Sequence, residues 1–344
     1  MKRMKTTEAV GQVLCHDITQ IIPGVTKDAV FRKGHIIREE DIPVLLSVGK
    51  DSVYIWENDE TMMHENDAAE VLYRMTANEH MHPSDVKEGK IEVIADTEGL
   101  LKVDREKLKK VNAFGEMMIA TRHGNTVVKK GDKLAGTRII PLVIKKDKMQ
   151  EAEKICDGTP ILKILPFTVK KAAIITTGNE VYHGRIKDAF TPVIEQKIAE
   201  FRAEMMFHEI FDDNDRKITD GCLRAIEAGA DIVFCTGGMS VDPDDKTPLA
   251  IKNTGAEMIS YGSPVLPGAM FLLSYYRKGD KVIPICGLPG CAMYNRRTIF
   301  DLVLPRLMAA DPVTADELAS LGEGGLCLNC KVCTFPNCGF GKGW

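Results

Sequence analysis

Three short apolar runs in this chain each end in a glycine turn, and the first two turns also carry hydroxyl and carboxylate side chains. The turns are Thr176-Thr-Gly-Asn-Glu180, Thr236-Gly-Gly-Met-Ser-Val-Asp-Pro-Asp-Asp245 and Gly287-Leu-Pro-Gly290. Glycine lets the backbone approach a ligand closely and turn its N–H groups toward an anion. The carboxylates of Asp245 and Glu180 are hard oxygen ligands that suit Mg²⁺. Together the turns predict a pocket for an anionic ligand.

Four cysteines form a second group whose side chains are suited to metal binding. Cys327, Cys330, Cys333 and Cys338 are separated by two, two and four residues. In a reducing compartment, cysteines at such density indicate metal ligands rather than disulfides. The spacing is close to the ferredoxin run without equalling it, and four thiolates fit Zn²⁺ equally well. The sequence therefore predicts an iron–sulfur cluster or Zn²⁺ here, with a disordered thiol tail that holds no metal as the alternative.

The apolar runs before the glycine turns predict neighbouring strands of an open α/β sheet. Continuous apolar runs such as 172–177, 231–235 and 282–286 are typical of parallel strands buried on both faces. In such a sheet, ligands bind outside the carboxyl ends of the strands. We therefore expect the three turns to share one sheet edge and to line one wide pocket.

Helical patterns separate these strands. Thr191 is expected to be the N-cap of a first helix with Pro192 at its first position, and Asp215 is expected to cap a second helix that ends at Gly229. A last helix is expected over 297–309. The buried faces of the first two helices are predicted to be Ile194, Ile198, Phe201 and Met205, and Ile218, Cys222, Ala225 and Ile226.

The predicted fold class is α/β, with a doubly wound three-layer domain over 169–312. A β-rich region precedes this domain and a short Cys-rich tail, 313–344, follows it. We divide the preceding region into an N-terminal segment, 1–60, and a β-rich domain with a linker, 61–168. Its short strands are punctuated by glycines, a pattern typical of a barrel or sandwich.

The composition is that of a globular protein without a basic surface. The 344 residues are 44% hydrophobic and 27% charged, and the net charge is -4. These values are ordinary for a soluble protein and disfavour general nucleic-acid binding. No apolar run at the start is typical of a secretory signal, and none approaches the roughly 18 residues of a membrane span. The sequence thus predicts a cytoplasmic protein that contacts neither nucleic acid nor membrane.

In this order, the three turns resemble the molybdopterin-binding domain shared by molybdopterin adenylyltransferases, molybdopterin molybdotransferases and competence-damage-like proteins. The first turn is similar to that family's Ser-Thr-Gly-Asp-Glu loop, and the second is similar to its Gly-Gly-x-Ser-x-x-x-x-Asp loop. Pro267-Gly268 and Gly287-Leu-Pro-Gly290 match the two remaining loops. The match covers about residues 169–310. Gly11-Gln-Val-Leu-Cys-His-Asp-Ile18 resembles the opening of the molybdotransferase subgroup, which makes 1–60 a molybdotransferase-like segment.

The resemblance implies a phosphorylated pterin dithiolene as ligand, with its phosphate on backbone N–H groups near helix N-termini. Asp245 and Glu180 are the implied catalytic residues, and Asp245 is also an implied Mg²⁺ ligand. Asp213 is a further candidate for the metal or for a pterin amine; for it, as for Asp242 and Asp244, capping or solvation is the alternative. The implied cofactor-binding residues are Thr177, Gly178, Thr236, Gly237, Gly238, Ser240, Pro267, Gly268, Gly287, Pro289 and Gly290.

Some positions depart from the family pattern. Pro267-Gly-Ala-Met270 replaces Pro-Gly-Lys-Pro and so lacks a cation beside the expected anion. Gly287-Leu-Pro-Gly-Cys-Ala292 replaces Gly-Leu-Pro-Gly-Asn-Pro, and Ala189-Phe190 replaces Ser-Asn. Cys291 is either a soft ligand for molybdenum or a small residue that fits the turn.

Three functions follow from the resemblance as hypotheses. The first is a homodimeric molybdotransferase that acts late in molybdenum cofactor biosynthesis and places molybdate on the dithiolene. The second, favoured by the lost lysine and asparagine, is a non-catalytic carrier that delivers the cofactor to a molybdenum enzyme. The third is a nucleotide-processing hydrolase of the competence-damage-like kind.

Overall fold

The computed structural model describes residues 2–22, 24, 26–55 and 59–343, and the chain divides into two compact units. Unit 1 comprises Met1–Asp96, Val103–Arg122 and Lys130–Lys163. Unit 2 comprises Thr97–Lys102, His123–Lys129 and Ile164–Trp344. All three predicted glycine turns and the four clustered cysteines belong to unit 2.

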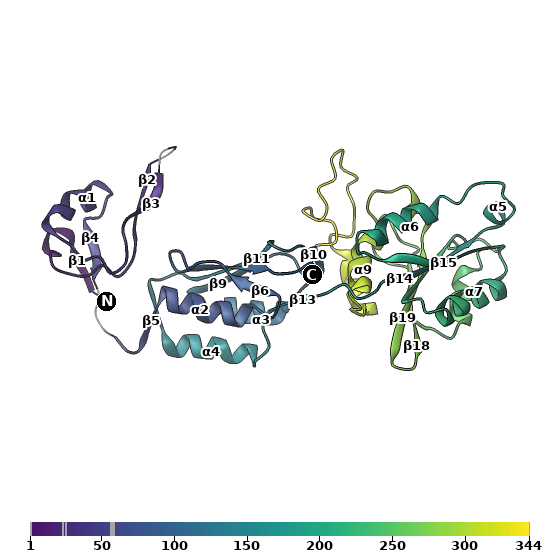
Figure 1. The fold of residues 1–344 in the computed structure, drawn as a ribbon, viewed down its shortest axis with the longest axis horizontal. Helices are drawn as coiled ribbons and strands as arrows, with labels where there is room; N and C mark the ends of the chain where they lie inside the picture. Colours follow the sequence, from purple (N-terminus) through teal and green to yellow (C-terminus); the bar gives the residue numbers. More distant parts are fainter. Residues whose placement is uncertain (1, 23, 25, 56–58, 344) are drawn as a thin grey trace. The chain divides into compact units, whose positions relative to one another are not determined.

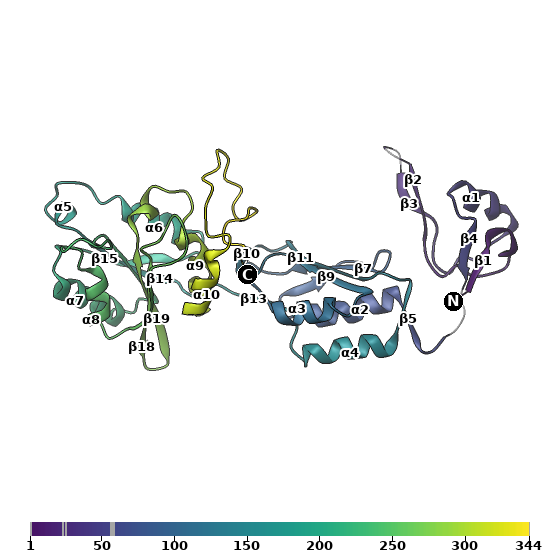
Figure 2. The same ribbon diagram turned by 180° about the vertical axis from the view of Figure 1, so that it is seen from behind.

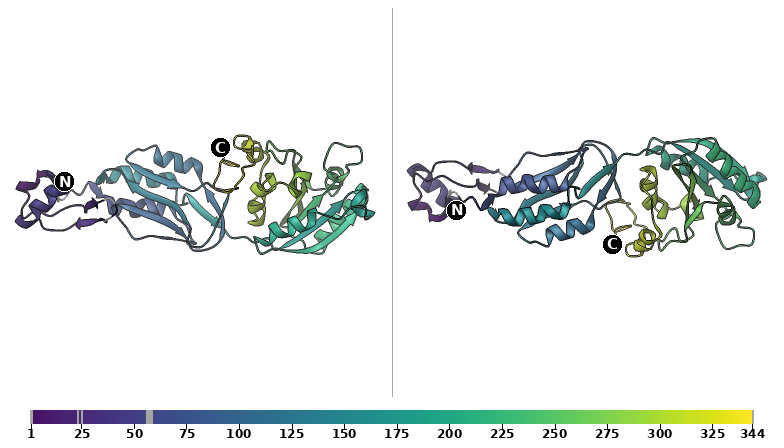
Figure 3. Two further views of the ribbon diagram at one scale, coloured as in Figure 1. Left: turned by 90° about the horizontal axis from the view of Figure 1, so that it is seen from above. Right: turned by 90° about the horizontal axis from the view of Figure 1, so that it is seen from below.

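Unit 1 is rich in β-structure and also contains helices. Strands β1 and β4 pair antiparallel, as do β2 and β3, and a further antiparallel sheet has the order β6-β7-β11-β9. Helix α2 packs on β7 and β11, α3 packs on β9, and α4 contacts both helices, so the helices lie along one face of the sheet (Figures 1 and 3). The bounds are β1 Lys2–Lys5, β2 Ile18–Ile22, β3 Thr26–Phe31, α1 Ile42–Ser47, β4 Ser52–Ile55, β5 Met62–His64, α2 Glu65–Thr76, β6 Met81–Pro83, β7 Lys90–Ala95, α3 Arg105–Asn112, β9 Met117–Thr121, β11 Lys133–Ile139, β12 Val143–Lys145 and α4 Lys146–Cys156.

The expectation of a barrel or sandwich in this region was wrong. The four-stranded sheet is open, and helices rather than a second sheet cover it. Helix α3 was not predicted because its sequence, Arg-Glu-Lys-Leu-Lys-Lys-Val-Asn, is mostly charged and buries only Val111. Such a helix has no broad apolar stripe that a sequence pattern can detect.

Unit 2 is built on a six-stranded sheet of order β15-β14-β16-β19-β18-β17. The first four strands are parallel neighbours, and β18 and β17 continue the sheet antiparallel. A smaller sheet has the order β10-β8-β13. The bounds are β8 Gly99–Val103, β10 Thr126–Val128, β13 Leu162–Leu165, β14 Lys171–Thr177, α5 Asn179–Tyr182, α6 Phe190–Ala199, β15 Glu204–Phe211, α7 Asp215–Glu227, β16 Ile232–Thr236, α8 Thr247–Asn253, β17 Glu257–Tyr261, β18 Leu272–Lys278, β19 Lys281–Leu288, α9 Ile299–Met308 and α10 Ala315–Ala319.

Helices cover both faces of the six-stranded sheet (Figures 1 and 2). On one face, Ile194 and Ile198 of α6 join the buried side chains of α9 and α10. On the other face, α7 and α8 contribute a second buried cluster that includes Ile218 and Ile251. A sheet between two helical layers is the doubly wound three-layer arrangement, so the predicted α/β fold is confirmed.

Two predicted helix starts were wrong by one or two positions. Helix α6 begins at Phe190 rather than after Thr191, because the carboxylate of Asp188 accepts the N–H groups of both residues. Helix α7 is capped by Asn214, whose side chain accepts from the N–H of Lys217, rather than by Asp215. Helix α6 also ends at Ala199, so Phe201 and Met205 lie beyond it. Among neighbouring polar residues, the one whose oxygen reaches the free N–H groups becomes the cap.

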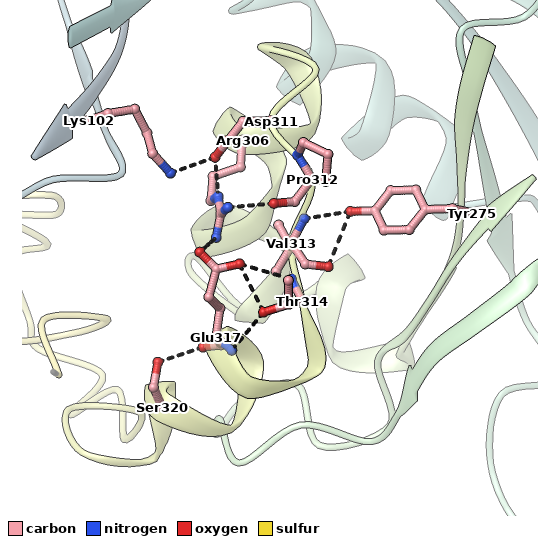
Figure 4. Close-up of polar contacts among 9 residues, drawn as sticks. All are labelled: Lys102, Tyr275, Arg306, Asp311, Pro312, Val313, Thr314, Glu317 and Ser320. Atoms are coloured by element: carbon pink, nitrogen blue, oxygen red, sulfur yellow. Dashed lines mark hydrogen bonds and ion pairs between the residues drawn. The ribbon is translucent and has the colours of Figure 1, made fainter. Parts of the chain in front are cut away.

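The turn between α9 and α10 is held by a buried arginine (Figure 4). The Arg306 side chain is only 7% exposed; its Nε donates to Asp311 Oδ2 at 2.5 Å, and a second nitrogen pairs with Glu317 Oε1 at 2.8 Å. Lys102 adds a second cation to Asp311, with Nζ at 2.7 Å from Oδ2. The Tyr275 hydroxyl accepts from the N–H of Val313 at 2.7 Å, and burial raises the pKa of this tyrosine to about 12. The network fixes the segment that follows α9.

None of the described helices combines the length and the apolar composition that a membrane crossing requires.

Candidate functional site

The three predicted turns lie side by side at one edge of the unit 2 sheet. Thr176 at the end of β14 is opposite Thr236 of β16, and Thr236 is opposite Leu288 of β19. The strands end here because Gly178 and Gly237 follow with φ of 128° and 82°, while the proline after β19 has no N–H to continue a ladder. The strand order thus brings residues more than 100 positions apart to one place.

A pocket of about 750 Å³ opens at this edge, and we name it the three-turn pocket after the edge where the turns lie. Its polar side chains are Ser240 and Asp245 of the second turn and Tyr294 and Asn295, which follow the third turn, and much of its wall is apolar. Ligand pockets of this size commonly combine apolar walls with a few convergent polar groups. The lining residues that the sequence analysis named are Gly237, Gly238, Ser240, Asp245, Pro267, Gly268, Pro289, Gly290 and Cys291.

Other predicted residues hold the turns rather than line the pocket. The hydroxyl oxygens of Thr177 and Thr247 are 2.9 Å apart, and Thr247 also donates to the carbonyl of Gly237 at 2.8 Å. These contacts tie the first turn to the second. Gly287 leaves room for the thioether of Met239, and Thr236 is fully buried. The expectation that all three turns line one pocket was wrong for the first turn. None of its residues lines the pocket, Thr177, Gly178 and Glu180 included, and Thr236 and Gly287 are absent from the lining as well.

Gly237 is where the first two turns meet most closely. Its φ of 82° lies in the left-handed region, and a Cβ there would overlap the carbonyl oxygen of Thr177. Gly255 has the same φ of 82°, but nothing lies within 4 Å of its Cβ position. A comparison of substitutions at the two glycines therefore distinguishes the cost of the left-handed backbone conformation from the cost of a steric clash with Thr177.

We expect Gly237→Ala to lower the melting temperature more than Gly255→Ala and to weaken pterin binding, whereas Gly255→Ala leaves binding unchanged. Both substitutions cost about 1–2 kcal/mol in backbone conformation, but only the first forces two turns apart. Thermal unfolding and pterin titration of both variants check this. Equal effects of the two substitutions on binding would show that turn spacing does not shape the site.

Asp213, which follows β15, lies near the acidic residues of the first two turns. Asp245 accepts the N–H of Ser240 at 2.8 Å, and Asp213 accepts the N–H of Asn179 at 3.1 Å. Partial burial raises the pKa of Asp213, and the nearby carboxylates of Glu180 and Asp245 raise it further. These carboxylates form an acidic group, in which burial and like charge both disfavour the ionised form of Asp213.

Asp188 positions Phe190 on the pocket wall. Its carboxylate accepts the hydroxyls of Thr176 at 2.9 Å and Thr191 at 2.6 Å. Burial opposes ionisation of Asp188, but the hydrogen bonds from Thr191 and Thr176 outweigh it and lower the pKa. Asp188 therefore stays charged and fixes the start of α6, where Phe190 lines the pocket.

Several lining residues were not found from the sequence as site residues. They are Met239, Leu266, Tyr294, Asn295 and Leu326. Cys327 also lines the pocket, although the sequence analysis named it only as a metal ligand. Tyr294 and Asn295 follow the third turn directly, so continuing that motif by a few residues would have found them. Leu326 and Cys327 reach the pocket from the tail, and no local pattern signals this.

The Cys-rich tail packs on unit 2 as a closed loop. The N–H of Leu266 donates to the carbonyl of Gly325, and the N–H of Cys327 donates to the carbonyl of Leu266, both at 2.8 Å. The N–H of Gly341 closes the loop on the carbonyl of Gly324 at 3.0 Å. Phe340 is buried in the core cluster of α9. The tail is thus anchored at both ends, unlike the disordered alternative.

A second cavity of about 250 Å³ lies within this loop. All four tail cysteines line it; Cys327 and Cys338 are half-buried, and Cys330 and Cys333 are exposed. The ring of Phe335 carries the Arg297 guanidinium at 4.8 Å from its centroid. Throughout the described ranges, no three His, Cys, Asp or Glu side chains stand in an arrangement that holds a metal ion. This applies to the acidic group of the turns and to the tail thiols alike.

Residues 173–309 match the family described as "Probable molybdopterin binding domain", and residues 3–57 match a domain of unknown function, DUF8806. A putative competence-damage inducible protein of Bacillus cereus (strain B4264) is 29% identical over 129 residues, which are 38% of this chain and 30% of that protein. One from Bacillus subtilis (strain 168) is 31% identical over 85 residues, or 25% of this chain and 20% of that protein. The chain thus spans less than a third of the length of these curated relatives.

Solved structures with similar chains include the tungsten cofactor synthesizing protein MoaB from Pyrococcus furiosus. It is 19% identical, with a TM-score of 0.35, and the match covers 42% of this chain and 95% of that one. The molybdopterin biosynthesis Mog protein from Mycobacterium ulcerans is 16% identical, with a TM-score of 0.32, over 44% of this chain and 99% of that one. Because residues 173–309 match the family model, this α/β domain of unit 2 belongs to the molybdopterin-binding domain family. The match supports molybdopterin as the ligand of the domain.

Proposed function

We propose that this chain binds molybdopterin in the three-turn pocket and acts late in molybdenum cofactor biosynthesis, placing molybdate on the dithiolene. The observation that carries the proposal is the 750 Å³ pocket, whose glycine and proline turns belong to the matched family domain. The backbone N–H groups of Gly237, Gly238 and Gly290 would receive the pterin phosphate. The apolar wall around Phe190 would cover the ring system.

Mg²⁺ is part of this proposal. Asp245 and Glu180 would hold it because hard oxygen donors suit this ion. Asp213 would be a third carboxylate, and the three would have to move together, since they do not stand in a metal-binding arrangement in the described residues. Burial is the main cause of the raised pKa of Asp213, and the carboxylates of Glu180, Asp245 and Asp244 raise it further, so a cation here would meet several negative charges. When bound, Mg²⁺ supplies charge stabilisation to phosphate oxygens. The protein's own part is to hold these oxygens in place and to exclude water.

The role of Asp213 can be tested through pH. When folding raises the pKa of an aspartate, the folded protein loses stability as the pH rises above the ordinary pKa of that residue, which is 3.8 here. We therefore expect Asp213→Asn to be more stable than the wild type at pH 7 without Mg²⁺, and the difference to shrink toward pH 4. Thermal unfolding across this range measures it. If the variant is less stable than the wild type at pH 7, the ionised carboxylate of Asp213 stabilises the fold through its hydrogen bonds, contrary to this prediction.

A carrier role is the second candidate. Ala269 and Met270 line the pocket where the family pattern has a cation, which weakens the hold on a charged reactant. A carrier would bind the finished cofactor and release it to a molybdenum enzyme. Purified protein that binds pterin but shows no molybdate-dependent turnover would decide for this role and against the transferase.

Four further assignments stay as proposals. A homodimer and a client molybdenum enzyme are expected from the family resemblance. For the four tail cysteines we keep the proposal of an iron–sulfur cluster or Zn²⁺ held by thiolates. The similarity to competence-damage inducible proteins leaves nucleotide hydrolysis as a third activity, which an assay of pyridine-nucleotide cleavage tests.

A further inference from the structure

The tail cavity and the three-turn pocket share a wall. Pro267, Asn295, Leu326 and Cys327 line both of them. Cys327 therefore belongs to the group of four tail thiols and to the wall of the ligand pocket at once. A change in the tail that moves Cys327 reaches the pocket directly.

Backbone hydrogen bonds strengthen this link. Leu266 accepts from Cys327 and donates to Gly325, so the tail pairs with the residue next to Pro267. The carbonyl of Pro267 in turn accepts the first N–H of α9, from Ile299, at 3.1 Å. The Pro267-Gly268 turn thus lies between the tail and the helix that anchors it.

From this shared wall we infer that the four tail thiols form a site for one thiophilic metal centre, and that loading of this site controls the shape of the ligand pocket. The centre is Zn²⁺ or an iron–sulfur cluster, since both take four thiolates. The control of pterin affinity rests on the proposed function; the metal site itself does not. Cys327 transmits the change because it is both ligand and pocket wall.

The charges around the cavity suit thiolates. Arg297 lies beside the thiol of Cys333, and Lys342 lies near Cys338. A metal centre held by four thiolates carries negative charge, which these two cations would offset. The Arg297 guanidinium is held in place by Asp301 at 2.8 Å and by the ring of Phe335.

Metal binding at this site includes a rearrangement. The exposed thiols of Cys330 and Cys333 must turn into the cavity that they line, because the four thiols do not converge in the structure described for this loop. Residues 326–343 contain no described helix or strand, so no regular hydrogen-bond ladder opposes this movement. The anchored ends, Cys327 and Phe340, keep the change local.

The test uses full-length protein purified anaerobically and stripped of metal. It is titrated with ZnCl2 alone, or reconstituted with ferrous iron and sulfide, and bound metal and sulfide are measured per chain. The variant is Cys330→Ser with Cys333→Ser; the control is Cys15→Ser in unit 1, whose hydroxyl can still donate to the Tyr54 carbonyl as the thiol does. Hydrogen exchange of residues 262–268 and pterin affinity are measured with and without metal.

We expect one centre per chain in the wild type and in Cys15→Ser, and none in the double variant. Metal should slow exchange at 262–268 and change pterin affinity by roughly tenfold or more, with no response in the double variant. Absence of stoichiometric metal, or equal metal in the double variant, would overturn the site. Metal that binds without affecting exchange would overturn the coupling. If metal changes the hydrogen exchange at 262–268 but the protein binds no pterin with or without metal, the proposed function is wrong, whereas the effect of the metal on the shared wall is confirmed.

Discussion

Asp245→Asn should reduce Mg²⁺-dependent pterin binding and molybdate-dependent turnover by roughly 100-fold or more, as expected when a preorganised charge is removed from a site. Asparagine can still accept the Ser240 N–H at the distance of 2.8 Å found for the carboxylate, so the turn should keep its shape. The substitution therefore removes the negative charge of residue 245 and keeps the hydrogen bond that shapes the turn. Titration with pterin at several Mg²⁺ concentrations measures the effect.

Asp244→Asn is the matched control, because it removes the neighbouring charge from an exposed position in the same turn. It should change binding by less than a few fold. If Asp244→Asn and Asp245→Asn weaken binding equally, the turn acts through its general negative charge and not through Asp245. If neither has an effect, the acidic group takes no part in ligand binding.

Arg306→Met should destabilise the α9–α10 region by about 3–5 kcal/mol, the usual result of removing one partner of a buried ion pair. Asp311 would keep Lys102 at 2.7 Å but would lose the arginine that also pairs with Glu317. Because α9 carries much of the buried cluster on one face of the sheet, the pocket edge should loosen with it. Hydrogen exchange of α9 amides should accelerate by roughly 100-fold or more, the factor that corresponds to this energy.

Arg277→Met provides the comparison. Arg277 pairs with Glu257 at 3.5 Å, and the two side chains are 68% and 60% exposed. Exposed pairs contribute about 0–1 kcal/mol, so α9 exchange should not change. An equal and small effect of both substitutions would contradict the view that the Arg306 network anchors this part of unit 2.

The three apolar strands of unit 2 and the turns after them could be predicted because their signals are local. The apolar runs at 172–177 and 231–235 need burial on both faces, and the glycines after them permit turns that other residues resist. The parallel direction of these strands then follows from the α/β pattern. This is why the shared edge of the three turns was foreseen.

The orientation of individual side chains within the turns could not be predicted. Thr177 and Thr236 were expected to contact the ligand, yet the first bonds to Thr247 and the second is buried. A strand buried on both faces has no polar alternation to show which residues face a pocket. Leu326 and Cys327 reach the pocket only through packing of a distant tail, which no pattern in the sequence encodes.

The most direct test of the account is pterin content after anaerobic purification, read as fluorescence of the oxidised pterin in the wild type and in Asp245→Ala, together with elemental analysis. We predict bound pterin in the wild type and its loss in the variant; molybdenum on the bound pterin would favour the carrier, and pterin without molybdenum the transferase. No pterin in either sample, even after molybdopterin is supplied, would contradict the assignment of the three-turn pocket.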